Sequence, residues 1–265
     1  MTLFARLDGA VRPAGDPLIP ATDSSVTHGD GVFETILVAG RRPLDLAEHQ
    51  ARLALSAMVL GIDTPEPAAW EPAIEALTEA FHADPEDESG DGATEFVLRL
   101  TSTRSGQHFA TAAPVPQRTL MERAGISVIL APDPFQRAVP YTTTVVKSLS
   151  YATNLAAKRY AQTQGADDVI FLGPDGTVTD GATATVVLSR DGELITPSAP
   201  GILPGITAAR LGARPKPVTA QDLVTADTVY LVSAIRLAAP VVMLDGRPRP
   251  HDAALTERIR RTLLR

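Results

Sequence analysis

Lys147 constrains the fold of this chain of 265 residues more than any other residue, because of what surrounds it in the sequence. It ends a β-like run that starts at Thr142, and it begins the sequence Lys147-Ser148-Leu149-Ser150-Tyr151. Downstream, Asp180 stands in a polar Thr-Asp-Gly turn, and the segment from Gly201 to Thr207 looks like a loop that enters a helix. A lysine at a strand end, an acid in a turn and a helix start are three parts of one site.

These three parts fit pyridoxal 5′-phosphate (PLP). This cofactor needs a lysine that forms a Schiff base, an acid that pairs with the pyridine nitrogen, and a cradle for its phosphate. The free N–H groups and the positive dipole end of a helix start suit a phosphate.

The chain also resembles a known family, through five sequence blocks that follow one another in a fixed order. The blocks are His28-Gly29-Asp30-Gly31-Val32-Phe33-Glu34-Thr35, His49-Gln50-Ala51-Arg52-Leu53, Lys147-Ser148-Leu149, Gly165-Ala166-Asp167-Asp168 and Leu203-Pro204-Gly205-Ile206-Thr207. In this respect the chain resembles the class IV aminotransferases of PLP fold type IV, and within them aminodeoxychorismate lyase and the short aminotransferases. The resemblance implies an α/β (α+β) fold of two domains with the cofactor at their interface. It also implies a PLP-dependent lyase or transaminase that forms a homodimer.

The composition argues against several other classes of function. An apolar fraction of 44% and a charged fraction of 21% are ordinary for a soluble globular protein. The net charge of −7, without a basic stripe, argues against a nucleic-acid partner. The absence of cysteine excludes thiol catalysis and disulfides and suits a cytoplasmic enzyme. Five scattered histidines lack metal-ligand spacing, so no metal is expected, and neither a signal core nor a membrane-spanning run is visible.

Periodicity predicts an α+β structure for the first third of the chain. A strand is expected at 32–38, and a helix follows Asp45, because Asp45-Leu46-Ala47-Glu48 resembles a capping box. A second helix is expected at 71–81 and a strand at 95–103. The acidic stretch at 84–92 is predicted to be a solvated surface loop.

The second part of the chain mixes strands with helices. Strands are predicted at 126–131, 168–172, 185–188, 228–232 and 241–244, and helices at 151–163, 206–211 and 252–264. Two prolines at 114 and 116 break regular structure, so a linker is expected at 113–122. The predicted domains are therefore an α+β domain at 1–112 and an α/β domain at 123–265 that carries Lys147.

Lys147 is the predicted catalytic residue. If its amine lies beside the cofactor, desolvation and nearby positive charge lower its pKa and raise the nucleophilic fraction. Once the substrate displaces it, the same amine becomes the general base and acid for the reacting carbon. Without the other blocks, a surface lysine at a strand end would be the simpler interpretation.

The resemblance implies further residues that bind the cofactor together with Lys147. These are Arg52, Asp180, Leu203, Gly205, Ile206, Thr207 and Ser233. Asp180 would pair with the pyridine nitrogen, and Leu203 would pack on the ring. The phosphate would be held by Arg52, by the amides of Ile206 and Thr207, and by the hydroxyls of Thr207 and Ser233.

Phe33, Arg99, Arg104 and Arg236 are the predicted substrate-binding residues. Phe33 is expected to line the pocket, and the arginines to bind substrate carboxylates. Arg99 and Arg104 are five residues apart, so both can serve one pocket only if the strand ends between them. The alternative interpretation for each arginine is a plain surface charge.

The predicted reaction is that of a 4-amino-4-deoxychorismate lyase, which releases pyruvate and 4-aminobenzoate and belongs to folate biosynthesis. The short chain, the run at 147–154 and the ending at 241–246 resemble the lyases. Asp180, Thr185 and Ala208 depart from the family pattern of Glu, Asn and Arg, which leaves the subfamily open. A branched-chain or D-amino-acid aminotransferase is the alternative, and a non-catalytic PLP-fold binding module is the alternative of another class. The expected partner is a small amino substrate with a carboxylate.

Overall fold

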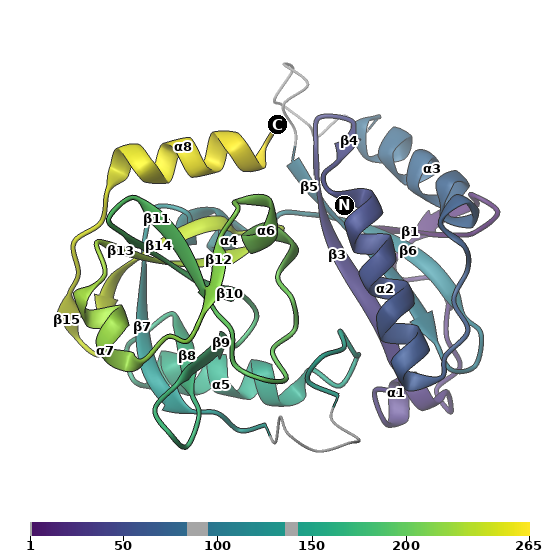
Figure 1. Ribbon diagram of the computed structural model, residues 1–265. Coiled ribbons are helices and arrows are strands. Elements are labelled where there is room, and N and C mark those ends of the chain that lie inside the picture. The colour runs from purple at the N-terminus through teal and green to yellow at the C-terminus, as the bar shows by residue number, and fades with distance from the viewer. Residues whose placement is uncertain (1, 84–94, 136–142) are drawn as a thin grey trace. The chain divides into compact units, whose positions relative to one another are not determined.

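The computed structural model describes residues 2–83, 95–135 and 143–265 (Figure 1). The chain forms two compact units, Met1–Pro116 with Val146–Ser150, and Gln117–Val145 with Tyr151–Arg265. The acidic loop predicted at 84–92 lies outside the described residues.

The first unit contains an antiparallel sheet whose strands are joined mostly by hairpins. The strand order is β2 (Val11–Pro13), β1 (Leu3–Arg6), β6 (His108–Pro114), β5 (Glu95–Thr103), β3 (Gly31–Ala39) and β4 (Arg42–Pro43). The predicted strands at 32–38 and 95–103 are confirmed, because β-branched and large apolar residues recur along them.

The first unit also contains helical segments, of which the two long ones pack on the sheet through one apolar face each. The segments are α1 (Ser24–Thr27), α2 (Leu46–Leu60), the 3₁₀ turn η1 (Pro67–Trp70) and α3 (Glu71–His82). Leu53 and Ala57 of α2 and Leu77 of α3 are buried in the same core as Trp70, while Met58 on the other face of α2 is exposed. Spacing of four residues places Leu53 and Ala57 on one side of the helix, which is why α2 forms here.

The capping box predicted at Asp45 is wrong. Asp45 does precede α2, but its φ of 52° is left-handed and its side chain makes no capping hydrogen bond. An N-cap side chain reaches the first-turn N–H groups from an extended backbone, and the left-handed conformation removes that reach.

The second unit contains a mixed sheet. Its strand order is β12 (Arg214–Lys216), β11 (Glu193–Pro197), β10 (Thr185–Arg190), β13 (Thr228–Ser233), β14 (Leu237–Leu244), β7 (Ile126–Pro132), β8 (Asp168–Leu172) and β9 (Val178–Gly181), with β15 (Arg247–Pro248) paired to β14. Parallel pairs join β7 to β14 and β8, and β11 to β12. The strands predicted in this part of the chain are confirmed, although β14 begins four residues earlier than expected.

The helices of the second unit are α4 (Gln117–Glu122), α5 (Ala152–Thr163), α6 (Ile206–Arg210), α7 (Ala220–Thr225) and α8 (Ala253–Leu263). Asp252 caps α8 by accepting a hydrogen bond from Leu255 N at 2.9 Å, and Ile259 and Leu263 are buried against the sheet. Helix α4 occupies most of the segment predicted as an irregular linker, because the prolines end β6 before the helix begins.

Lys147 belongs to the first unit, and not to the second as the sequence predicts. Phe33 N donates to Lys147 O at 2.9 Å, Leu149 N donates to Gly31 O at 2.8 Å, and Ser148 forms a β-bridge with Val32. The residues just before Lys147 form turns, so the predicted strand that ends at Lys147 is absent from 143–146. Instead of a strand before Lys147, residues 147–149 pair with the start of β3.

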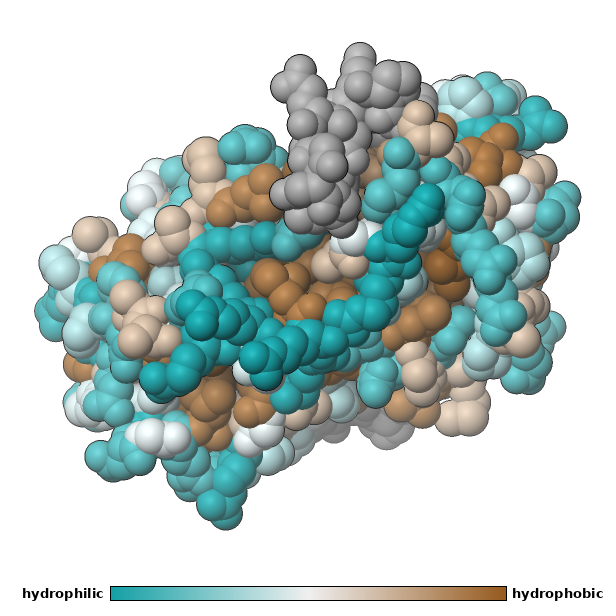
Figure 2. Space-filling model, turned by 90° about the horizontal axis from the view of Figure 1, so that it is seen from above, coloured by the Kyte–Doolittle hydropathy of each residue, from teal (hydrophilic) through white to brown (hydrophobic). Residues whose placement is uncertain are grey.

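The face shown in Figure 2 is covered mainly by hydrophilic and intermediate residues, with hydrophobic residues in patches between them. Within residues 2–83, 95–135 and 143–265, no helix is both long enough and apolar enough to cross a membrane.

Candidate active site

Lys147, Phe33 and Arg99 lie together in the first unit. Lys147 Nζ is 4.7 Å from the centroid of the Phe33 ring, and Arg99 Cζ is 3.6 Å from the same centroid. The strand register explains the second contact. Phe33 pairs with Thr101, so Arg99 is its diagonal neighbour on the same face of the sheet. Three of the predicted site residues are thus brought to one place.

Two glycines allow the Lys147 segment to pack on the start of β3. A Cβ on Gly31 would lie 2.9 Å from Ser102 O and closer still to the side chain of Leu149. Gly29 has a φ of 70°, and a Cβ there would lie 2.6 Å from Ser150 Oγ. The glycines of the His28–Thr35 block therefore leave the space in which the Lys147 segment packs.

Arg52 is held by a buried carboxylate that the sequence did not single out. Its Nε donates to Glu34 Oε1 at 2.6 Å and its Nη2 donates to Glu34 Oε2 at 2.8 Å. His49 Nδ1 lies 2.7 Å from Glu34 Oε2, and both Glu34 and His49 are buried. This two-point contact fixes the plane of the Arg52 guanidinium.

Glu34 stays ionised because of these partners. Burial by itself raises the pKa of the Glu34 carboxyl, but hydrogen bonds and charge from Arg52 and His49 outweigh burial and lower the pKa to about 2. The only available sequence signal was that Glu34 stands inside the first block and His49 and Arg52 share the second.

The side chain of Arg104 binds a carboxylate and two backbone carbonyls of the first unit. It pairs with Asp30 through Nε and Nη2, and it donates to the carbonyls of Leu60 and Gly61 at 2.9 and 3.1 Å. Those carbonyls end α2, where a cation is favourable. The strand does end at Thr103, between Arg99 and Arg104, but the Arg104 guanidinium is used to cap a helix.

In the second unit, Gly205 precedes α6 and Thr207 lies in its first turn. A Cβ on Gly205 would collide with Thr185 Oγ1 and lie 3.0 Å from Thr185 Cβ, so only glycine lets α6 begin so close to β10. Ile206 and Thr207 therefore present N–H groups that have no acceptor within their own helix. Leu203 is half-buried in the loop before α6.

Asp180 lies in β9 and not in a turn as predicted. One of its carboxylate oxygens accepts a hydrogen bond from Gly181 N at 3.0 Å. The turn itself is at 173–176, where Gly173 N donates to Thr177 O.

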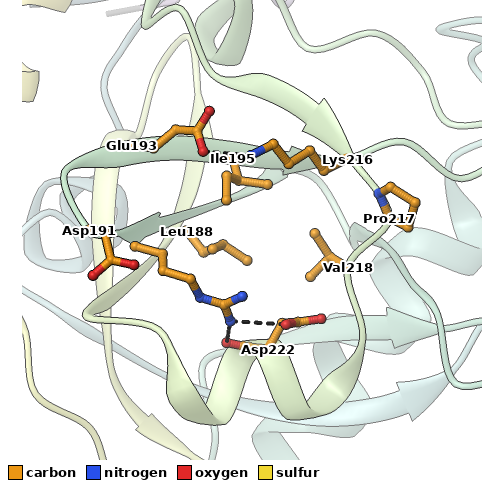
Figure 3. A pocket seen from close by; sticks show the side chains of 9 residues that line it. Leu188, Asp191, Glu193, Ile195, Lys216, Pro217, Val218 and Asp222 are labelled. Atoms are coloured by element: carbon orange, nitrogen blue, oxygen red, sulfur yellow. Dashed lines mark hydrogen bonds and ion pairs between the residues drawn. The ribbon is translucent and has the colours of Figure 1, made fainter.

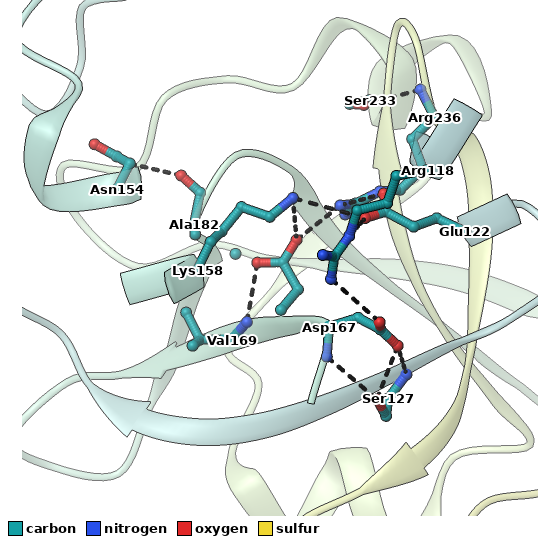
Figure 4. Close-up of polar contacts among 12 residues, drawn as sticks. Arg118, Glu122, Ser127, Asn154, Lys158, Asp167, Val169, Ala182, Ser233 and Arg236 are labelled. Carbon is teal, nitrogen blue, oxygen red and sulfur yellow. Dashed lines mark hydrogen bonds and ion pairs between the residues drawn. The ribbon is translucent and has the colours of Figure 1, made fainter. Parts of the chain in front are cut away.

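Arg236 is buried within a group of charges (Figure 4), and its predicted role in binding substrate stays a prediction. Its Nε donates to Glu122 Oε2 at 2.9 Å and its Nη2 donates to Asp168 Oδ2 at 2.7 Å. Burial alone would lower the pKa of Arg236, but Asp168 and Glu122 raise it overall. Ser233 Oγ accepts a hydrogen bond from Arg236 N at 3.2 Å.

A separate pocket of about 260 Å³ lies beside β10, β11 and β12 (Figure 3). Apolar side chains, Leu188 among them, share its lining with ion pairs between Arg190 and Asp222 and between Lys216 and Glu193. None of the predicted site residues lines it. Among the described residues, no group of three or more His, Cys, Asp or Glu side chains could hold a metal ion.

Comparison with known proteins identifies the family. A family model described as amino-transferase class IV matches residues 31–244. The chain is 36% identical over 277 residues to a bifunctional aminodeoxychorismate lyase / D-amino acid transaminase of Mycobacterium tuberculosis, covering 94% of this chain and 93% of that protein.

Solved structures agree. A hypothetical aminotransferase from Mycobacterium tuberculosis, in its PLP-bound form, is 32% identical with a TM-score of 0.88, covering 98% of both chains. A fold IV-transaminase from Curtobacterium pusillum is 33% identical with a TM-score of 0.88, covering 99% of this chain and 97% of that one. The fold and the matched motifs together show that this chain belongs to the class IV amino-transferase family.

Proposed function

We propose that this protein is a PLP-dependent 4-amino-4-deoxychorismate lyase that releases pyruvate and 4-aminobenzoate. The observation that carries the proposal is the grouping of Lys147 and Arg99 around the Phe33 ring. A nucleophilic amine and a cation for a carboxylate are what a substrate with an amino group and carboxylates requires. The 36% identity to a protein that is named for this lyase activity supports the same choice.

The residues present fit PLP. Lys147 would supply the amine for the covalent bond to the cofactor, and Asp180 would supply a carboxylate for the pyridine nitrogen. Arg52, Thr207 and Ser233 supply donors for the phosphate. Gly205 lets α6 begin against Thr185 of β10, and the N–H groups at this helix start would be further donors for the phosphate.

When bound, PLP supplies an electron sink for the carbon that loses a proton. Lys147 Nζ would take the proton from that carbon as a general base and would give a proton to the departing enolpyruvyl oxygen, directly or through water. The substrate would divide into 4-aminobenzoate and enolpyruvate, which tautomerises to pyruvate, so no second substrate would be needed. Asp180 is one methylene shorter than the usual Glu, and its negative charge favours a protonated ring nitrogen.

Arg99 is the arginine that we assign to a substrate carboxylate. Its guanidinium carbon lies 3.6 Å from the centroid of the Phe33 ring, which is a cation–π contact. Arg104 and Arg236 are assigned structural roles, because Asp30 engages the first and Glu122 and Asp168 engage the second.

Transamination of D-amino acids is the second candidate function. The Mycobacterium tuberculosis relative carries both activities in its name, and one related structure from that organism holds α-ketoglutarate and PMP. Removal of the carbon-bound proton by Lys147 is common to both reactions, so the same residues serve either one.

The test is to give the purified protein aminodeoxychorismate with no amino acceptor. Pyruvate and 4-aminobenzoate should appear in equal amounts over many turnovers. An inert aminodeoxychorismate, together with keto-acid formation from D-alanine and α-ketoglutarate, would favour the transaminase. A protein that stays colourless after PLP is added would favour the non-catalytic module.

We also propose a homodimer. Helix α2 exposes Leu55, Met58 and Val59 at 49%, 70% and 48%, which is an apolar surface that a second copy could cover. Sedimentation that finds only monomer at working concentration would contradict it. The cytoplasmic location stays a prediction.

A further inference from the structure

The turn that joins β13 to β14 is held in place by buried side chains. Ser233 pairs with Leu237 across this hairpin, and the three residues between them form the turn. Arg236 extends from the turn to Glu122 on α4 and Asp168 on β8. Arg123, next to α4, donates to Ile235 O at 2.7 Å. The turn is therefore fixed both through its backbone and through a side chain.

The backbone at the end of the turn is strained. Leu237 has a φ of 62° and is buried. A branched residue rarely adopts the left-handed region, and it persists there only when its surroundings over-determine the conformation. The contacts of Arg236 and Arg123 are the surroundings that do so here.

The turn also orients the Ser233 hydroxyl. Ser233 Oγ accepts a hydrogen bond from Arg236 N at 3.2 Å. Because the oxygen is the acceptor in this bond, the hydroxyl keeps its own proton to donate elsewhere. A hydroxyl donor that is polarised in this way suits an anion.

Binding both carboxylates requires the shape of the Arg236 guanidinium as well as its charge. Its Nε serves Glu122 while its Nη2 lies 2.9 Å from Glu122 and 2.7 Å from Asp168. Lys158 Nζ lies 3.4 Å from Asp168 and 3.8 Å from Glu122, so it neutralises part of the charge but does not reach the turn. A planar fork can bind two carboxylates in fixed directions, which an ammonium cannot do.

We propose that Arg236 is a positioning residue, which docks on Glu122 and Asp168 and thereby fixes the Ser233–Leu237 turn so that the Ser233 hydroxyl binds the cofactor phosphate. This inference rests on the proposed function, since it requires that the protein binds PLP. It gives Arg236 a role other than contact with substrate.

The experiment compares binding of PLP with binding of pyridoxal, which has the same aldehyde and ring but no phosphate. Dissociation constants are measured by absorbance titration for the wild type, Arg236→Met, Arg236→Lys, Ser233→Ala and the double variant Ser233→Ala/Arg236→Met. We expect Arg236→Met to raise the dissociation constant of PLP about tenfold, as for the loss of one charge-assisted hydrogen bond. The dissociation constant of pyridoxal should change by no more than about twofold. Arg236→Lys should raise the dissociation constant of PLP by nearly the same factor. The double variant should lose no more than the larger single effect, because both changes remove one contact.

Arg190→Met is the matched control, because it breaks an ion pair with Asp222 in the same unit without touching the turn. It should leave the ratio of the two dissociation constants unchanged. If Arg236→Met does not fold, Arg123→Met is measured by the same criterion, with an expected loss of about threefold for PLP only. Equal weakening of PLP and pyridoxal, or additive effects in the double variant, would overturn the inference. A wild type that binds neither aldehyde would overturn the proposed function itself.

Discussion

At the scale of single residues, the environment of each charged side chain decides its role. Lys147 and Arg99 both lie over the ring of Phe33, whereas Arg104 is used at a helix end and Arg236 is buried with two carboxylates. All three arginines look alike in the sequence. Their partners in the structure differ, which is why we propose Arg99 for the substrate carboxylate and structural roles for Arg104 and Arg236.

Replacing Lys147 with alanine should lower turnover about a thousandfold or more, because the lysine is both the anchor and the general base. The fold should persist, since the backbone bonds of Lys147 to Phe33 and Ser56 do not need its side chain. Turnover, cofactor absorbance and circular dichroism check this. Lys216→Ala, which alters a lysine paired with Glu193, is the control that should keep its activity.

Replacing Glu34 with glutamine should make the stability of the protein less dependent on acid pH. The pKa of Glu34 falls from its usual 4.5 to about 2 in the folded protein, so the stability it contributes is present above pH 4.5 and is lost as the pH falls toward 2. That contribution is on the order of 3 kcal/mol.

Urea unfolding of both proteins between pH 7 and pH 3 measures the effect. The stability gap between wild type and Glu34→Gln should be largest at neutral pH and should narrow below pH 4.5. A gap that stays constant over this range would show that the Glu34 carboxylate is not held ionised by Arg52 and His49.

At the scale of elements, close packing explains why certain glycines stand where they do. Gly31 and Gly29 let the segment 147–150 pair with β3, and Gly205 lets α6 start against Thr185 of β10. Each glycine removes a side chain at a point where two segments far apart in sequence touch. The motif glycines therefore serve packing between elements.

Gly205→Ala should destabilise the protein by about 1–3 kcal/mol, as overpacking does, and should weaken PLP binding because the start of α6 must shift. Adding Thr185→Ala removes Oγ1 and Cγ2, two of the three atoms that a new Cβ would meet, and should restore part of the loss. Gly15→Ala is the control, because a Cβ there meets nothing within 4 Å. Unfolding by denaturant and PLP titration give the two readouts, and no rescue by Thr185→Ala would contradict the packing explanation.

At the scale of the whole molecule, stability should depend on the cofactor. PLP at about one hundred times its dissociation constant should stabilise the folded state by about 2.7 kcal/mol. For a chain of this size, that corresponds to a rise in Tm of about 5–10 °C. Thermal melts with PLP and with pyridoxal test this. An equal shift with both compounds would argue against the phosphate contacts assigned to Arg52, Thr207 and Ser233.

The sequence by itself determined the family, the order of the motifs and most of the regular structure. The strands at 95–103 and 168–172 have the bounds that the sequence predicts, and α3 differs by one residue at its end. These features depend on local patterns, because the spacing of apolar residues within one segment reports which of its faces is buried.

Only the tertiary structure decided the partners of the charged residues and the unit to which Lys147 belongs. Arg236 lies 114 residues from Glu122 along the chain, and Arg52 lies 18 residues from Glu34. No local pattern encodes such pairs, because each is made when separate elements pack together. For the same reason, the left-handed Asp45 and the strand at Asp180 were not predictable from their immediate neighbours. Local spacing determines which segments form, and packing over long sequence distances determines which side chains meet.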